Sequence, residues 1–247
     1  MRRTTLALML IATGLGTTHA ADNELTVVGG LDFGFKKLHL DTGASGNVFN
    51  PSFTTIIPNI ALGYQSLYAI LSYDKSLGAD HRTTDSVVGG NPTSTTTDFS
   101  RTDSTATLGY RLGNSFSVFG GYTKGVNEFS QTSAVAILIV TDITYTETGP
   151  FVGASYTNNF GNKGSLGLSL AYAKLDSELK TVTHPNLGRS DTKGDNTGLS
   201  YGLTWSGTLN GSLGYRIGVK GIQYKMDEPV KITERYTNFF MGITNYF

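Results

Sequence analysis

The histidines and their acidic neighbours are the residues of this chain with the clearest capacity for chemistry. Beyond residue 20 the histidines are His39, His81 and His184. Asp80 stands directly before His81 and Asp85 follows it, but the second acidic pair that a proteolytic His–Asp site would need is missing from this spacing. No His-x-Ser sequence occurs, so no base and hydroxyl nucleophile stand two apart on one strand face. We therefore expect no enzymatic activity.

Metal and cofactor sites have no recognisable spacing in this sequence. The chain contains no cysteine, which excludes disulfides, thiol nucleophiles and zinc sites of the cysteine type. Carboxylates such as Asp191 and Asp195 could touch Ca²⁺ weakly, but their spacing does not form a calcium loop. No glycine-rich phosphate loop follows a strand and opens a helix. We predict no metal site and no cofactor.

Charged residues recur on a face that otherwise carries small side chains. Within the alternating segments this face reads mostly Ser, Gly and Ala, as at 165–173 and 198–204. Two interpretations stay open: the charges pair and rigidify the structure, or they line a conducting path and bias its choice of ion. Basic residues outnumber acidic ones in the set, so a conducting path would have a weak anion preference. The candidates for this lumen-lining set are Asp32, Lys36, Asp74, Arg111, Arg216 and Lys220.

The elements that must position these residues are strands. Apolar residues alternate with small or polar ones through about ten segments bounded by turn residues, and a period of two indicates β-structure. Short connections are expected at 63–66, 112–115, 158–164 and 206–211, and mostly long ones near 39–52, 78–99, 125–145 and 180–195, with a shorter one near 226–231. The segments centre on 25–38, 53–62, 67–77, 106–110, 116–122, 152–156, 166–172, 199–205, 213–219 and 239–247.

The amino terminus has the pattern of a secretory signal peptide. Arg2 and Arg3 give a cationic start, and Leu6–Leu15 is an apolar run too short to span a membrane. Thr18-His19-Ala20 supplies small residues at the positions that signal peptidase reads, so we predict cleavage after Ala20. Residues 1–20 would then be the signal peptide and residues 21–247 a single domain.

The last strand of the chain is apolar on one face and ends on an aromatic residue. Every second residue from position 239 reads Phe239, Met241, Ile243, Asn245 and Phe247. Together with the signal peptide, the strand pattern and the unequal connections, this strand resembles the terminal signature of small bacterial outer-membrane β-barrel proteins as a class. The resemblance covers nearly the whole mature chain and does not single out one family.

That resemblance implies the fold and the compartment. The fold would be an all-β, closed, antiparallel, up-and-down transmembrane barrel of about ten strands, with eight or twelve as alternatives. The chain would lie in the outer membrane of a Gram-negative cell. In this class the terminal strand is read by the barrel assembly machinery, a role that falls here on Phe239, Met241, Ile243 and Phe247, whereas Asn245 departs from the usual apolar choice.

Composition and aromatic placement agree with a membrane barrel better than with the soluble alternative, a secreted β-sandwich. A sandwich also alternates, but it buries its apolar face and needs no aromatic belt. Here aromatic residues stand near strand ends, where interfacial girdles belong. The formal net charge is zero, and loss of Arg2 and Arg3 makes the mature chain slightly negative, so nothing suggests a nucleic-acid partner. The girdle candidates are Tyr73, Tyr110, Tyr122, Tyr156, Tyr172, Trp205 and Phe247.

The sequence indicates the function less directly than the fold, because one fold can carry many functions. A lumen lined by small residues favours a passive, porin-like channel for small solutes. The alternative is a non-conducting surface barrel whose long outer loops bind a partner or stabilise the envelope. Expected partners are outer-membrane lipid and lipopolysaccharide, the assembly machinery and possible small solutes.

One apolar segment does not fit a solvated outer loop. Ala134–Val140 falls where an exposed connection is expected, although large apolar loops are unusual. It would extend a neighbouring strand into a protruding hairpin, fold into the lumen as a plug, or form an apolar gate for a greasy ligand. The neighbouring loop at 82–104 is rich in Ser, Thr and Asp and is expected to be solvated.

Overall fold

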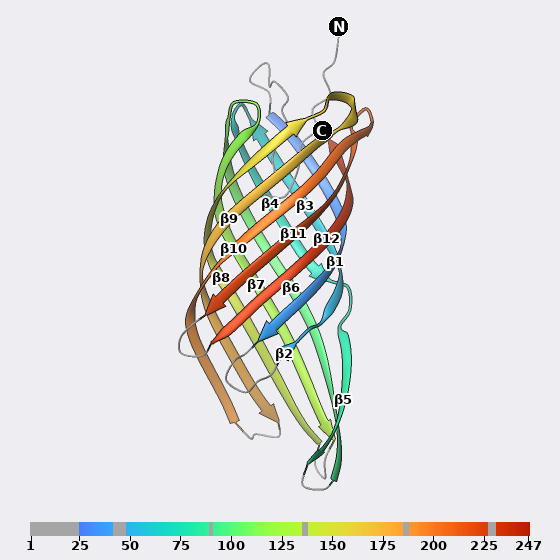
Figure 1. The fold of residues 1–247 in the computed structure, drawn as a ribbon, viewed down its shortest axis with the longest axis vertical. Helices are drawn as coiled ribbons and strands as arrows, with labels where there is room; N and C mark the ends of the chain where they lie inside the picture. Colours follow the sequence, from blue (N-terminus) through green and yellow to red (C-terminus); the bar gives the residue numbers. More distant parts are fainter. Residues whose placement is uncertain (1–24, 42–47, 89–90, 135–137, 185–187, 227–230) are drawn as a thin grey trace.

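The computed structural model describes residues 25–41, 48–88, 91–134, 138–184, 188–226 and 231–247. They form one antiparallel sheet that closes into a ten-stranded barrel, because the last strand pairs with the first (Figure 1). The predicted fold class is therefore confirmed. The wall strands are β1 (Leu25–Asp41), β3 (Ser52–Tyr64), β4 (Leu67–Ser76), β6 (Asn91–Leu112), β7 (Phe116–Ala134), β8 (Leu138–Asn159), β9 (Ser165–His184), β10 (Gly188–Asn210), β11 (Leu213–Met226) and β12 (Ile232–Tyr246).

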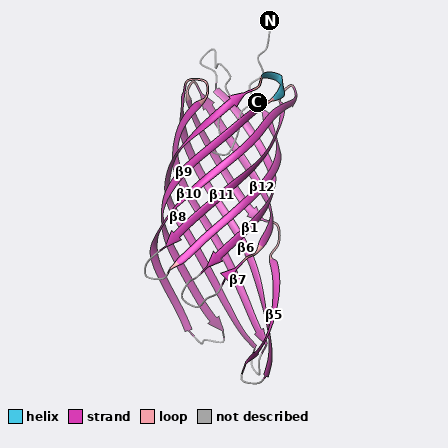
Figure 2. Cartoon of the chain, viewed as in Figure 1, coloured by secondary structure: helices cyan, strands magenta, loops and turns pink. Residues whose placement is uncertain are grey.

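Three small elements complete the described chain. The short strand β2 (Val48–Phe49) pairs with the end of β1, and β5 (Asp80–Val88) pairs with the first half of β6. A single 3₁₀ turn, η1 (Gly161–Lys163), joins β8 to β9 (Figure 2). No helix within the described residues is long and apolar enough to cross a membrane.

The barrel closes at a seam between the first and the last strand. Ile243 lies opposite Leu31, and Met241 lies opposite Phe33. The predicted signal peptide, Met1–Ala20, lies outside the described residues.

The four predicted short turns all lie at one end of the barrel, which we call the turn end. They fall after β3, β6, β8 and β10, and the carboxyl terminus lies at the same end (Figure 1). Gly113 and Gly211 occupy two of these turns with φ of 71° and 47°, values that an L side chain rarely adopts. The opposite end, from which paired strands project, is called the hairpin end.

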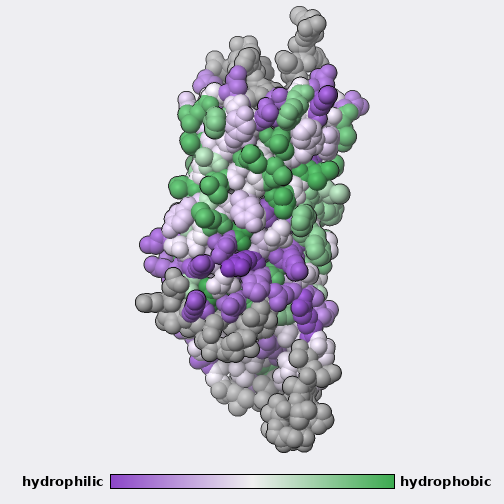
Figure 3. All heavy atoms as spheres, in the orientation of Figure 1, coloured by the Kyte–Doolittle hydropathy of each residue, from purple (hydrophilic) through white to green (hydrophobic). Residues whose placement is uncertain are grey.

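Burial in this barrel is inverted relative to a soluble protein. The side chains of Phe33 and Phe35 are 50% and 52% exposed, whereas those of Asp32 and Lys36, which flank this pair in sequence, are 0% and 1% exposed. Exposed apolar side chains form a band around the wall (Figure 3). Such an apolar band requires a lipid bilayer around it. The closed sheet is also suited to a bilayer, because it leaves no strand edge with unpaired backbone N–H and C=O groups.

The long connections predicted near 78–99, 125–145 and 180–195 are mostly strand, so the loop prediction was wrong there. The β6–β7 ladder continues to the pair Ser94–Ala134, and the β9–β10 ladder continues to the pair Thr183–Gly188. Toward the tips of these extensions both faces meet water, so no apolar alternation marks the tips in the sequence. Their many threonines have high strand propensity, which supplies the physical reason for their structure.

The apolar segment Ala134–Val140 contributes to one of these hairpins. Ala134 ends β7 and pairs with Leu138, the first residue of β8. Residues 135–137 lie outside the described residues. For the described part, the interpretation as a strand extension is confirmed.

Candidate functional site in the barrel lumen

The inner face of the barrel wall carries the residues from which a function must be built. Alternation directs residues such as Asp32, Lys36 and Leu38 inward from β1, in this order from the turn end to the hairpin end. Instead of an open passage, these side chains form successive layers across the lumen.

The first layer is an ion pair between Asp32 and Arg216. The Arg216 Nε donates a hydrogen bond to Asp32 Oδ1 over 2.6 Å, and a second guanidinium nitrogen of Arg216 contacts Asp32 Oδ2. Both side chains are almost completely buried. The two parallel contacts fix the guanidinium in one orientation, as a bidentate pair does.

The second layer, nearer the hairpin end, begins with Lys36. Its Nζ lies 2.7 Å from Asp74 Oδ2 and 2.6 Å from Asp103 Oδ2, so one ammonium joins strands β4 and β6 to β1. The same nitrogen lies 4.9 Å from the ring centroid of Tyr236, a cation–π distance. Lys36 is thus held from three sides.

Arg101 on β6 is the centre of this second layer. Its guanidinium donates to Asp103 over 2.8 Å and to Asn127 Oδ1 over 3.0 Å, and it also contacts Glu234 on β12. Glu147 on β8 lies 3.8 Å away. The strands of Arg101 and Glu234 have three other strands between them, and both side chains are almost fully buried, so their contact crosses the lumen. Glu147 is nearer along the wall, because β7 alone separates β8 from β6.

Glu147 has further partners that hold it in place. The hydroxyl of Tyr145 donates to Glu147 Oε1 over 3.2 Å, and the amide of Asn196 contacts the same oxygen. Glu147 Oε2 forms no hydrogen bond among the described residues, although Arg101 is within ion-pair distance. A buried carboxylate with one incompletely satisfied oxygen depends on its cationic neighbour.

An apolar cluster, the lumen cap, fills the lumen around and beyond Arg101 toward the hairpin end. Phe99 and Phe129 meet within it edge to face, with ring centroids 5.1 Å apart. In a water-filled lumen, side chains on the inner face would be exposed to solvent. All members of this cluster are buried, so side chains rather than water occupy the lumen here. The lumen cap consists of Leu38, Leu40, Phe53, Phe99, Phe129, Tyr145, Ala173, Leu175, Ile222, Tyr224, Met226, Ile232 and Tyr236.

A cavity of about 90 Å³ lies between the two ionic layers. Three carboxyl or amide Oδ1 atoms, of Asn59, Asp74 and Asn238, are buried there without a hydrogen-bond partner among the described residues. Such atoms mark positions for water or a very small polar solute. Ligand sites for larger molecules have volumes of roughly 300–1,000 Å³, so this cavity does not admit a sugar or a nucleoside.

The six sequence-predicted lumen residues lie in three different settings. Asp32, Lys36, Asp74 and Arg216 are in the two ionic layers. Lys220 lines the cavity, and no carboxylate within the described residues approaches its Nζ to within ion-pair distance. Arg111 is near the turn end, where its guanidinium reaches the carbonyl of Gln65 over 3.5 Å.

Sequence reasoning missed the centre of the second layer. Arg101, Asp103, Glu147 and Glu234 all point inward, yet they lie outside the segments whose alternation was legible. Adding them makes the acidic and basic lumen residues even in number, which removes the basis for an anion preference. One signal in the sequence could have found two of them. Arg101 and Asp103 continue the alternation that points Thr105 and Thr107 inward on β6.

The histidines lie apart from this lumen network. His81 pairs with Asp98 on the exposed β5–β6 hairpin, and the ring of His184 lies 3.7 Å from a carboxylate oxygen of Asp142. Within the described ranges there is no group of three or more His, Asp and Glu placed to hold a metal ion. The absence of enzymatic activity remains a prediction.

Comparisons with known proteins agree on the fold. No family model matches the chain, and no curated protein matches its sequence. The translocator domain of the autotransporter NalP from Neisseria meningitidis is similar in structure, with a TM-score of 0.51 at 11% identity over 92% of this chain and 89% of that chain. The chain has the fold of the outer-membrane β-barrels. At this identity the likeness shows the fold alone.

Two other similar structures are more distant. Ail, the attachment invasion locus protein of Yersinia pestis, has a TM-score of 0.40 at 12% identity, over 90% of this chain and 99% of that chain. The toluene transporter TodX of P. putida has a TM-score of 0.39 at 7% identity, over 92% of this chain and 91% of that chain. At these scores neither protein carries an argument about what this chain does.

Proposed function

We propose that this chain is an outer-membrane barrel with a closed lumen that acts at the cell surface through its projecting hairpins. The lumen cap carries this proposal, because it fills the passage together with the ionic layer of Arg101. In outer-membrane barrels short turns face the periplasm and long connections face outside. The hairpin end would therefore face the cell exterior.

The chemistry of the projecting hairpins suits a surface that contacts a polar partner. Hydroxyl groups meet across the strands, as in the 2.9 Å contact between Thr95 and Ser133. Arg189 donates to Asp191 over 3.0 Å on the part of β10 beyond the apolar band. These hydrogen bonds lower the pKa of the Asp191 carboxyl, so this pair stays charged to a lower pH than an isolated aspartate would.

Conductance tests the closed lumen. The purified barrel in planar lipid bilayers should show no steady conductance under a holding potential. Regular steps of constant size from the unaltered protein would contradict the proposal and favour a passive channel.

The absence of cysteine allows surface display to be measured with single labels. Ser190→Cys, at the exposed start of β10, should react with a membrane-impermeant maleimide on intact cells. Asn162→Cys, in the exposed turn η1 at the other end, is the matched control and should react only after the outer membrane is permeabilised. Labelling of both positions on intact cells, or of Asn162→Cys alone, would overturn the orientation.

A small-solute channel is the second candidate, favoured by one observation. The closing layers consist of side chains on the wall strands, and a cavity with Lys220 in its lining already lies between them. Rearrangement of side chains alone would then join the cavity to one mouth, without movement of the wall.

A further inference from the structure

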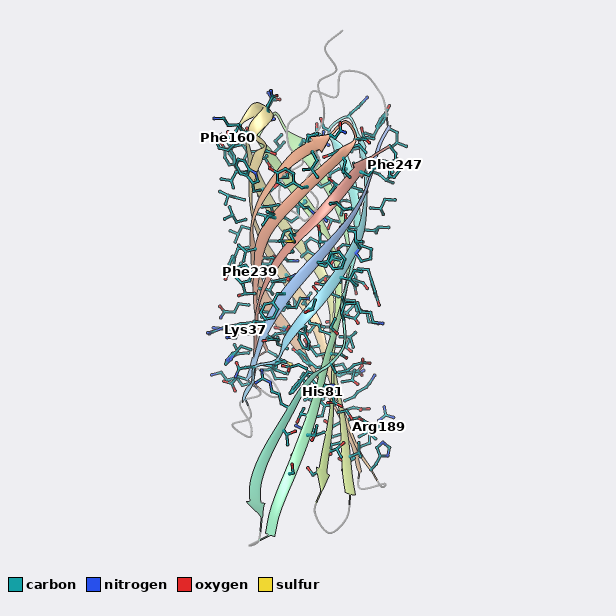
Figure 4. All side chains as sticks on the ribbon, turned by 90° about the vertical axis from the view of Figure 1, so that its right-hand side faces the viewer. Lys37, His81, Phe160, Arg189, Phe239 and Phe247 are labelled. Atoms are coloured by element: carbon teal, nitrogen blue, oxygen red, sulfur yellow. The ribbon has the colours of Figure 1, made fainter. Side chains whose placement is uncertain are left out.

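A ring of exposed basic side chains surrounds the barrel at the edge of the apolar band nearest the hairpin end. In Figure 4, Lys37 projects from the wall just beyond Phe239, which belongs to the band. Figure 3 shows hydrophilic residues following the apolar band on this side. We call this ring the basic belt; its members are Lys37 on β1, Lys75 on β4, Lys124 on β7, Lys174 on β9, Lys225 on β11 and Arg235 on β12.

Sequence spacing places four of these lysines next to the aromatic girdle. Each stands two residues after an exposed aromatic side chain and is therefore the next outward residue on its strand. The aromatic girdle marks the depth of the lipid headgroups. The pairs are Phe35 with Lys37, Tyr73 with Lys75, Tyr122 with Lys124 and Tyr172 with Lys174.

Strand register gives the lysines a common type of neighbour. Lys75 lies opposite Thr102, Lys124 opposite Thr148, and Lys174 opposite Thr197. The remaining two follow the same rule, with Lys37 opposite Thr237 and Lys225 opposite both Thr197 and Thr233. Directly opposed residues point to the same side of a sheet. Each lysine of the belt thus offers an ammonium beside a hydroxyl group, two kinds of hydrogen-bond donor, whereas Arg235 lies opposite His39 and Gln223.

The belt is not neutralised by carboxylates of the wall. Among the described residues, Lys174 is the one belt member with a carboxylate within 4 Å, and its contact with Asp195 is 3.8 Å long with both side chains well exposed. The outward carboxylates of these strands lie farther from the apolar band. Glu128 stands two outward positions beyond Lys124, and Asp176 stands one beyond Lys174. Basic side chains on six of the ten wall strands therefore border the lipid.

We propose that the basic belt binds the phosphate groups of phosphorylated lipid in the leaflet that faces the cell exterior. Charge complementarity carries this assignment: phosphate is an anion that accepts several hydrogen bonds, and it lies at the depth where the belt offers donors. Lipopolysaccharide, expected as a partner from the sequence, carries such phosphates. The proposal rests on the membrane orientation given above but not on the closed lumen. A conductance result that contradicts the closed lumen therefore leaves the basic belt untouched, and a negative lipid-binding result leaves the closed lumen untouched.

Heat unfolding of the purified barrel tests the proposal with defined lipids. Lipid A in mixed detergent micelles should raise the unfolding temperature by several degrees, and dephosphorylated lipid A with the same acyl chains should not. Inorganic phosphate at the same concentration should also give no shift, which separates the lipid from a free anion. Equal shifts with phosphorylated and dephosphorylated lipid, or a full shift with inorganic phosphate, would overturn the proposal.

Variants with equal loss of charge locate the effect. Replacing Lys37, Lys75, Lys124 and Lys174 with Gln should abolish the shift, whereas the Lys-to-Gln change at the off-belt positions Lys163, Lys180, Lys193 and Lys231 should preserve it. If the fourfold belt variant does not fold, the pair Lys124→Gln and Lys174→Gln should reduce the shift, and the same pair changed to Arg should retain it. A belt variant that responds like the unaltered protein, or an off-belt variant that loses the response equally, would contradict the assignment.

Discussion

Asp32 on β1 and Arg216 on β11 are both register partners of one residue, Gly242 on the intervening strand β12. Their ion pair therefore crosses β12 on the inner face. A glycine lies beneath it because a Cβ at position 242 would come within 2.0 Å of Asp32 Oδ1 and 2.4 Å of the Leu31 carbonyl oxygen. The pair joins the first strand to the last but one, across the seam that closes the barrel.

Gly242→Ala should destabilise the barrel by roughly 1–3 kcal/mol or more, as overpacking of a tight interior does. The added methyl group would displace Asp32 and open the pair with Arg216. Equilibrium unfolding in urea from lipid vesicles measures the change. The matched control is Gly63→Ala on β3, where the nearest atom to a new Cβ is 3.5 Å away and little change is expected. Equal stability of both variants would mean that the seam does not depend on this pair.

Arg101→Met should destabilise the barrel by about 3–5 kcal/mol, because it leaves buried carboxylates without their cation. Adding Glu234→Gln to this variant should recover part of the loss, since one of those charges is then removed. Arg189→Met is the control: its pair with Asp191 is exposed, and exposed pairs contribute little. If Arg101→Met and Arg189→Met had the same effect in urea unfolding, the second ionic layer would not be a stabilising element.

The fold was predictable where one face of a strand meets lipid, and unpredictable beyond the apolar band, where the outward side chains are polar. Phe33 and Phe35 alternate with small or polar residues, so the sequence predicts strand β1. Thr95–Thr97 show no alternation of apolar and polar residues, although they also belong to a strand. The lumen was predictable only in part. Alternation placed Asp32 and Arg216 on the inner face, but their pairing depends on the register across β12, which the pattern along a single strand does not encode.

Deletion of Phe247 should reduce the amount of barrel assembled in the outer membrane. The role in assembly follows from the resemblance of the terminal strand to those of outer-membrane barrels. In the structure the Phe247 backbone N–H donates to the carbonyl of Val27 over 3.0 Å, so the deletion also shortens the seam. Heat-modifiable protein in isolated membranes gives the yield. Phe116→Ala removes another exposed aromatic side chain near the same end and should assemble normally; equal yields for all three proteins would remove the assigned role.

Opening the lumen cap should convert the barrel into a conductor if the cap is the barrier to ions. The triple change Phe99→Ala, Phe129→Ala and Leu175→Ala removes large buried side chains from three strands without altering the ionic layers. We expect conductance steps from this variant in planar bilayers and none from the unaltered protein, because water and ions can enter a widened passage but not one that apolar side chains fill.

The matched control for the lumen cap carries the same three residue types on the outer face. Phe33→Ala, Phe35→Ala and Leu199→Ala shorten side chains that are about half exposed to lipid, so this variant should remain silent. Steady conductance from the unaltered protein, unchanged by the cap variant, would show that ions bypass the cap and would favour the channel over the closed surface barrel. A silent cap variant that retains its fold would instead place the barrier in the ionic layer around Arg101.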